Sequence, residues 1–228
     1  MAYKRGTSAN IIVGAAALFT YESGPLGLDP TTKALTDAQS EVDLPALQED
    51  ITYRETLSND VDFRNVGYTM NGLEIQFQPD FGEVQVDQVL DVAKLYKQGM
   101  QVNLNTAFAE STLENLLLAV AGANDDLAED DESTGLFAGN RVLDMSAGDI
   151  GECPVERGLV AVGPGTGDCA EGDSLERIYV AYRALSIENV SVTARRDEPT
   201  MFEVSFRLLP NDDASYGKIV DRTLSLVS

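Results

Sequence analysis

The 228-residue sequence contains no histidine and no tryptophan. Histidine is the usual general base near neutral pH and the commonest metal ligand, so its absence excludes imidazole-based triads and imidazole metal sites. Glycoside hydrolysis by paired carboxylates would need a setting that raises one carboxyl pKa, and no aromatic or apolar setting of that kind is visible. These absences predict a protein that is not an enzyme and that uses no cofactor.

Basic residues are also scarce, because 16 lysines and arginines stand against 38 acids and give a formal charge of −22. Such a chain repels the phosphate backbone, so specific nucleic-acid binding is not expected. Copies of the chain repel one another too, and self-assembly would need salt, which shortens the Debye length to about 3 Å near 1 M. An acid excess with few lysines is typical of proteins from salt-loving hosts.

The sequence has two cysteines, Cys153 and Cys169, in a glycine-rich stretch. They could form a disulfide that closes a surface loop, or remain two free thiols. A protein assembled inside a cell first meets a reducing environment, which disfavours the bridge. Both alternatives stay open at this point.

Two further motifs are interpreted as exposed loop. The sequence GPGTGD at 163–168 lacks the lysine and hydroxyl residue of a phosphate-binding P-loop. Six acids between Asp125 and Glu132 lack the spacing of a calcium-binding EF-hand loop, so a solvated charge run is favoured. No metal site is expected.

An apolar run from Ile11 to Phe19 follows Lys4 and Arg5. A signal peptide would show a similar pattern, but this run contains Gly14 and β-branched residues and is too short to span a bilayer. A buried first strand over 10–21 is favoured, and no membrane association is expected.

Length and composition favour one domain over residues 1–228, since 43% of the residues are apolar. Within this domain, the weak periodicity of residues 23–60 predicts a long loop or arm, in which Asp29 could cap a short helix. Residues 123–173 predict an irregular, acidic and glycine-rich insertion that holds one short strand over 136–149.

Alternation of apolar and polar residues predicts strands in the middle of the chain. Residues 68–88 favour a β-hairpin with its turn at 79–82, and residues 100–108 predict a third strand. The polar face of these strands carries amides and acids and no lysine or arginine. Its members are Glu74, Gln76, Gln78, Gln85, Asp87, Gln101, Asn103 and Asn105.

A helix is predicted over 111–122, where Ser111 and Glu114 match a capping box and Gly122 can end the helix. Later strands are predicted around 178–182, 190–192, 202–208 and 216–228. The predicted fold is mainly β, with two packed antiparallel sheets, as a β-sandwich or barrel, and one flanking α-helix.

Three features resemble the major tail tube proteins of long-tailed, siphovirus-like viruses. They are the hairpin that ends in Val86-Asp87-Gln88, the AESTLEN entry to the helix at 109–115, and a late strand that leads into Leu209-Pro210 and Tyr216-Gly217. Together they cover about half of the chain. The resemblance implies the tail tube fold: a structural virion protein, assembled in the host cytoplasm, whose sheets join around hexameric rings that stack into a tube.

In such a tube the wide closed barrel leaves an aqueous channel. The resemblance implies that the eight polar residues are lumen candidates and that DNA passes during ejection without specific binding. It also implies three partners besides the chain itself: a tape measure protein, a tail terminator and a distal tail protein. The alternatives are a secreted acidic β-sandwich module that binds carbohydrate or calcium, and a tail terminator or capsid decoration protein.

Overall fold

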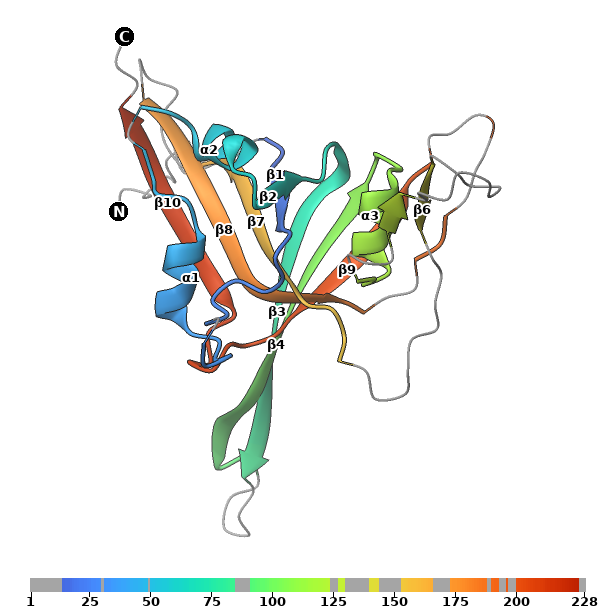
Figure 1. The fold of residues 1–228 in the computed structure, drawn as a ribbon. Coiled ribbons are helices and arrows are strands. Elements are labelled where there is room, and N and C mark those ends of the chain that lie inside the picture. Colours follow the sequence, from blue (N-terminus) through green and yellow to red (C-terminus); the bar gives the residue numbers. More distant parts are fainter. Residues whose placement is uncertain are drawn as a thin grey trace, which may run out of the picture.

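The computed structural model describes residues 14–29, 31–48, 50–84, 91–123, 127–129, 140–143, 153–165, 173–187, 190–192, 196 and 200–225. In these ranges the protein is mainly β, and its strands pair antiparallel (Figure 1). The elements are, in chain order, β1 (Ala17–Tyr21), α1 (Asp37–Asp43), α2 (Tyr53–Asn59), β2 (Phe63–Asn65), β3 (Thr69–Val84), β4 (Lys94–Phe108), α3 (Leu113–Ala119), β5 (Leu127–Glu129), β6 (Arg141–Leu143), β7 (Arg157–Pro164), β8 (Asp173–Ser186), β9 (Phe202–Leu208) and β10 (Gly217–Ser225).

Eight of the strands form a single sheet in the order β2-β1-β7-β8-β9-β4-β3, and β10 also pairs with β8. The long strand β8 holds the sheet together, because it pairs with β10 along Asp173–Ala181 and with β9 along Ala184–Ser186. We call β2-β1-β7-β8-β10 the first half and β9-β4-β3 the second half. Strands β5 and β6 form a separate two-stranded sheet.

The prediction of a mainly β, antiparallel fold is confirmed, but the single chain does not divide its main strands into two packed sheets, and it has more than the one predicted helix. The described ranges contain one large eight-stranded sheet that is not closed into a barrel, the small β5-β6 sheet and three short helices. The two halves stay hydrogen-bonded because β8 is long enough to offer the same edge to two partners.

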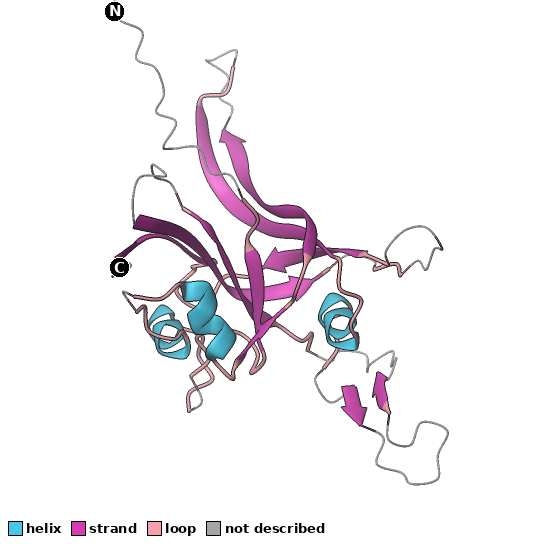
Figure 2. Cartoon of the chain, turned by 90° about the horizontal axis from the view of Figure 1, so that it is seen from above, coloured by secondary structure: helices cyan, strands magenta, loops and turns pink. Residues whose placement is uncertain are grey.

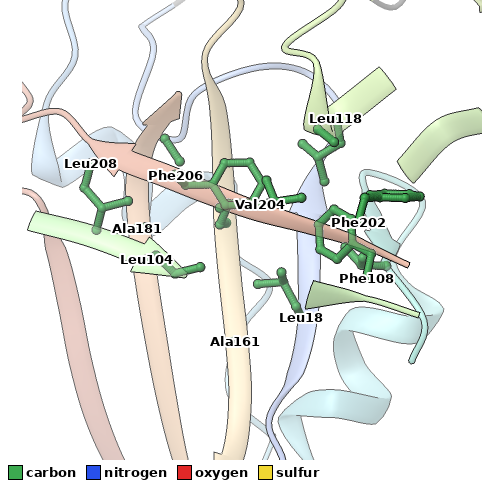
Figure 3. Close-up of a cluster of buried hydrophobic side chains, with 14 of the residues drawn as sticks. Leu18, Leu104, Phe108, Leu118, Ala161, Ala181, Phe202, Val204, Phe206 and Leu208 are labelled. Atoms are coloured by element: carbon green, nitrogen blue, oxygen red, sulfur yellow. The ribbon is translucent and has the colours of Figure 1, made fainter. Parts of the chain in front are cut away.

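The two halves of the sheet face each other across a hydrophobic core (Figure 3). Leu18, Ala161 and Ala181 come from the first half, while Leu104 and Phe206 come from the second. Phe108 packs edge-on against Phe202 in this cluster, with ring centroids 5.7 Å apart. Removing these side chains from water is the main favourable contribution to folding of the halves onto each other.

The other face of the first half has its own core, made where residues 23–60 fold back over the sheet. Leu26, Tyr53 and Leu57 from this segment pack against Phe19 and Val160. Strand β7, which is buried from Arg157 to Val162, is thus covered on both faces. It lies within the stretch predicted to be irregular, and its continuous apolar run is typical of a strand with no wet face.

Residues 23–60 were predicted to be a loop or arm, but they contain α1 and α2 and are tied to the sheet. Thr36 and Thr52 cap the two helices by accepting backbone N–H groups. Asp29 instead organises a turn, in which its carboxylate accepts the backbone N–H groups of Thr31 and Thr32.

Buried charge anchors α2 to the sheet. The carboxylate of Glu176 on β8 accepts the backbone N–H of Tyr53, and Arg222 on β10 lies 3.6 Å from the same carboxylate. Arg222 also donates to the carbonyl of Ile51. These contacts join β8, β10 and the start of α2.

The predicted hairpin with a turn at 79–82 is wrong, because those residues continue β3. Strand β3 pairs with β4 at both of its ends, with register shifts between Met70 and Glu74 and between Asp80 and Phe81. Pro79 is tolerated there because β3 is an edge strand, which can leave one donor position empty. The outer part of β3 and β4, Asp80–Val84 with Lys94–Gly99, extends from the body as a two-stranded segment, which we call the ribbon (Figures 1 and 2).

Helix α3 is confirmed, but its caps differ from the prediction. Thr112, and not Ser111, is the N-cap, since its hydroxyl accepts the backbone N–H of Asn115. At the other end Ala121 adopts a left-handed conformation, and the N–H of Gly122 bonds to the carbonyl of Leu117.

Several strand predictions are confirmed and one is not. Strands β1, β4, β8, β9 and β10 overlap the predicted segments, and β6 lies inside the predicted strand at 136–149. Residues 190–192 form no strand.

Candidate functional site: the polar face of the second half

Six of the eight predicted lumen residues lie together as three cross-strand pairs. Directly opposite residues of β3 and β4 share one face of a sheet. The pairs are Glu74 with Asn105, Gln76 with Asn103, and Gln78 with Gln101. Period two on both strands, together with this register, makes a continuous polar surface, which we call the polar face. Gln85 and Asp87 lie outside the described residues.

Hydrogen bonds among neighbours hold the side chains of the polar face in place. The Gln76 amide donates to the Glu74 carboxylate at 3.1 Å, and the Gln101 amide donates to Asn103 Oδ1 at 3.2 Å. The amide nitrogen of Asn105 lies 3.5 Å from Glu74 Oε2. Amide groups can both donate and accept hydrogen bonds, so neighbouring side chains satisfy one another's hydrogen-bonding groups. The face therefore presents few charged groups to a ligand.

Strand β9 extends the polar face by a third row that the sequence reasoning did not assign to it. Asn103 lies opposite Arg207, Asn105 opposite Ser205, and Ala107 opposite Glu203. The Ser205 hydroxyl donates to Asn105 Oδ1 at 2.7 Å. The alternation of residues 202–208 predicts a strand with one polar and one apolar face. It does not show which strand lies beside it, so the polar residues of this strand could not be assigned to the polar face.

Arg207 corrects one expectation about the surface, which was predicted to carry no lysine or arginine. Its side chain is exposed, and it shares the β9 row of the face with the exposed Glu203. The row therefore carries one positive and one negative group, and the whole surface stays amide-rich with a small acidic excess.

The polar face has a shallow depression at the start of the β3 strand. It is lined by Asn71, Gly72, Glu74, Asn105, Thr106, Ala107, Glu203, Val204 and Ser205. The Thr106 hydroxyl donates to the carbonyl of Gly72 across it. Asn71 and Gly72 both have positive φ and lie at the register shift between Met70 and Glu74, so the backbone departs from the regular ladder here.

The opposite face of the same three strands is apolar and forms part of the core. Ile75 pairs with Leu104, and Leu104 pairs with Phe206. Figure 3 shows the side chains of Leu104 and Phe206 within the core cluster. The second half is thus wet on one face and dry on the other, as predicted for residues 73–78 and 101–108.

Strand β3 lies at the end of the strand order, and the described part of the chain pairs it with β4 alone. An edge of this length presents backbone N–H and C=O groups that another strand can use. The polar face therefore ends at a border where a further strand could continue both its ladder and its rows.

A second charged cluster lies beside α3 and has a structural role. Arg64 donates to Glu22 at 2.7 Å and to Asn115, while Arg141 pairs with Glu114. The buried Arg157 lies in the same pocket, and its burial lowers the pKa of the guanidinium. These groups join β2, α3, β6 and β7.

No three His, Cys, Asp or Glu side chains of the described ranges gather in the way that a metal site requires. None of the helices in the same ranges has the length and apolar character of a membrane span. Cys153 is exposed, and Cys169 lies outside the described residues, so the structure tests neither the disulfide nor the two free thiols.

Neither a family model nor a curated protein matches the sequence.

Proposed function

We propose that the protein is the structural subunit of a viral tail tube, and that it works as a ring of identical copies stacked on further rings. The observation that carries this proposal is the polar face: amide-rich rows in register on β3, β4 and β9, backed by a dry core and ending at an edge that no described strand covers. Its partner at that edge is a neighbouring copy of the same chain.

In this arrangement the second halves of the copies join edge to edge into a closed barrel. Head-to-tail pairing around a rotation uses two different edges of each copy and closes a ring. The polar face then lines the bore, and the core face packs against the first half, which forms the outer layer of a sandwich-like subunit. Six copies are expected from the resemblance to tail tube proteins.

The polar face suits the passage of DNA because it offers little for a phosphate backbone to grip. DNA affinity arises from several lysine or arginine contacts to phosphates. The face carries one arginine, Arg207, in the same row as Glu203, among amides and the acid Glu74. A duplex in such a bore would meet water and mobile counterions and would slide without a preferred position.

The charge of the chain makes the assembly depend on salt. A six-membered ring would carry six times the formal charge of −22. Repulsion between such rings extends over about 10 Å at 0.1 M salt and over about 3 Å at 1 M. Tubes are expected in molar salt, and shorter species are expected after dilution.

Electron microscopy of the purified protein at high and low salt tests the proposal. Rings with a central bore, and tubes made of stacked rings in high salt, are the expected result. A compact single-chain particle at every ionic strength would overturn it. Single rings that never stack would instead favour a tail terminator.

The bore assignment is tested by adding positive charge to the polar face. Glu74→Lys with Gln78→Lys should slow DNA ejection from particles that carry the variant subunit, because lysines facing the bore bind phosphates. Asp50→Lys with Glu55→Lys, on exposed residues of the 23–60 segment, is the control with a larger change in charge. Ejection that is equally fast in all three particles would contradict the assignment.

A further inference from the structure

The side of β3 that no described strand pairs with, which we call the open edge, can be described group by group. In an antiparallel ladder, every second residue directs both its N–H and its C=O to one neighbouring strand, and the residues between direct theirs to the other side. The pairing of β3, β4 and β9 therefore determines which residues of β3 face outward.

Two hydrogen bonds at the ends of these strands fix the alternation. The N–H of Ala109 bonds to the carbonyl of Tyr68 directly opposite, so the odd-numbered residues of β4 direct their backbone groups to β3. The carbonyl of Ser205 accepts the N–H of Ile187, so the odd-numbered residues of β9 face β8 and the even-numbered ones face β4. Even residues of β9 lie opposite even residues of β4, which again leaves the odd residues of β4 for β3.

The three polar-face residues of β3 lie opposite odd-numbered residues of β4, so they use their backbone groups within the chain. The residues between them direct theirs to the open edge. These outward residues are Leu73, Ile75 and Phe77, and each offers one N–H and one C=O. Pro79 occupies the next outward position, which agrees with the assignment because proline is tolerated where a strand donates no ladder bond.

The open edge is bounded at both ends. At one end Pro79 has no N–H to offer. At the other end Asn71 and Gly72 have positive φ at a shift in register. The regular part between them, Leu73–Phe77, has the length of an ordinary strand, about five residues.

The apolar side chains along the open edge also lack a neighbour. Phe77 lies on the apolar face of the second half, opposite the buried Val102, yet 55% of it is exposed. Ile75 on the same face is partly buried, whereas Leu104 opposite it is buried. The apolar face is thus covered at β4 and left half open along β3, where the sheet ends.

We propose that a strand of a second copy pairs with Leu73–Phe77, bonds to the outward backbone groups and covers Phe77 with its own apolar side chains. Paired residues share a face, so this strand has apolar residues opposite Ile75 and polar residues opposite Gln76. A second copy supplies such a strand, since its own second half alternates in the same way. In strand addition the main-chain bonds give affinity and the alternate side chains give specificity. This inference rests on the proposed function and names the backbone groups through which neighbouring copies join.

Hydrogen exchange tests the contact residue by residue, because it reports which amides are bonded. In unassembled protein at low salt, the amides of Ile75 and Phe77 should exchange roughly tenfold faster, or more, than the amide of Gln76, which bonds to β4. In tubes at high salt they should become as slow as Gln76. Mass spectrometry with residue-level fragmentation measures all three. Amides of Ile75 and Phe77 that stay fast in tubes would overturn the contact.

Ile75→Pro removes one outward N–H and leaves the ladder with β4 intact. It should raise the protein concentration needed for half-maximal assembly in high salt by roughly tenfold, measured by sedimentation velocity. Ile75→Ala is the matched control, since it loses the same side chain but keeps the N–H. The two variants should melt at similar temperatures at low salt, whereas Gln76→Pro should melt lower because it breaks the ladder inside the chain. Equal assembly of Ile75→Pro and Ile75→Ala would overturn the contact.

These measurements separate the contact from the proposed function itself. Rings or tubes in which the Ile75 amide exchanges as fast as in the unassembled protein would overturn the contact and leave the proposed function standing. A wild-type protein that stays a single chain at every ionic strength would overturn both.

Discussion

The first half of the sheet is covered on both faces, whereas the second half is covered on one. Strand β7 is buried between two cores: the core between the two halves, which we call the shared core, and the core under residues 23–60. Strands β3 and β4 instead expose amides and acids to water on one face. The first half also carries the buried ion pair of Glu176 and Arg222. We infer that the first half holds the subunit together and that the second half is shaped by what it must contact and let pass.

The largest expected effect is a core truncation in the first half. Phe19 is fully buried, so Phe19→Ala should lower the free energy of unfolding by about 3–5 kcal/mol. Phe77→Ala in the second half is the comparison: that side chain is half exposed and should cost less than about 1.5 kcal/mol in unassembled protein. Urea unfolding at low salt measures both. Equal losses would mean that the two halves do not differ in this way.

The next effect concerns the buried ion pair. Arg222→Met should cost about 3 kcal/mol, because it leaves the Glu176 carboxylate buried without its cation. The double variant Arg222→Met, Glu176→Gln should recover most of that loss, since no uncompensated charge remains. Urea midpoints at pH 7 for the wild type, Arg222→Met, Glu176→Gln and the double variant form a double-mutant cycle. A double variant as unstable as Arg222→Met would show that the loss is one of packing and not of charge.

A smaller effect is expected at α3, which packs Leu118 and Ala119 into the shared core. Thr112→Ala removes the N-cap and should cost about 1 kcal/mol. Ser111→Ala, one residue earlier, should change the melting temperature very little. A larger loss of stability for Ser111→Ala than for Thr112→Ala would show that Ser111 is the N-cap.

The smallest effect is the pH dependence of the α1 anchor in the first half. The Tyr182 hydroxyl beside Asp37, and then Lys218, lower the pKa of the Asp37 carboxyl. A lowered pKa stabilises the fold at pH values above the ordinary aspartate value of about 3.9, and that stabilisation is lost as the pH falls through the lowered value.

The wild type should therefore be more stable than Asp37→Asn at pH 6, by less than about 1 kcal/mol because the pair is partly exposed. The difference should close towards pH 3. Parallel thermal melts across this range measure it, and a difference that grows in acid would have the wrong sign.

The polar rows could be predicted because period-two alternation reports a half-wet strand directly. Glu74, Gln76 and Gln78 were assigned to one face, and so were Gln101, Asn103 and Asn105. Their pairing could not be predicted, because turn residues at 79–82 indicated a hairpin closing there. An edge strand absorbs such residues with a shift in register, which the sequence does not reveal.

Two features of the first half escaped prediction for different physical reasons. Strand β7 is buried on both faces and so has no alternation to detect. Helices α1 and α2 have seven residues each, about two turns, which is too short for a helical period to stand out. Their stability comes from caps and from contacts with distant strands, above all with Glu176 and Lys218.

Strand β8 holds the whole length of β10 but meets β9 along Ala184–Ser186 alone. This short stretch of pairing resists a change in the angle between the first half and the second half far less than a full ladder would. In the proposed tube, compliance located inside each subunit would let the wall curve while the contacts between copies stay intact.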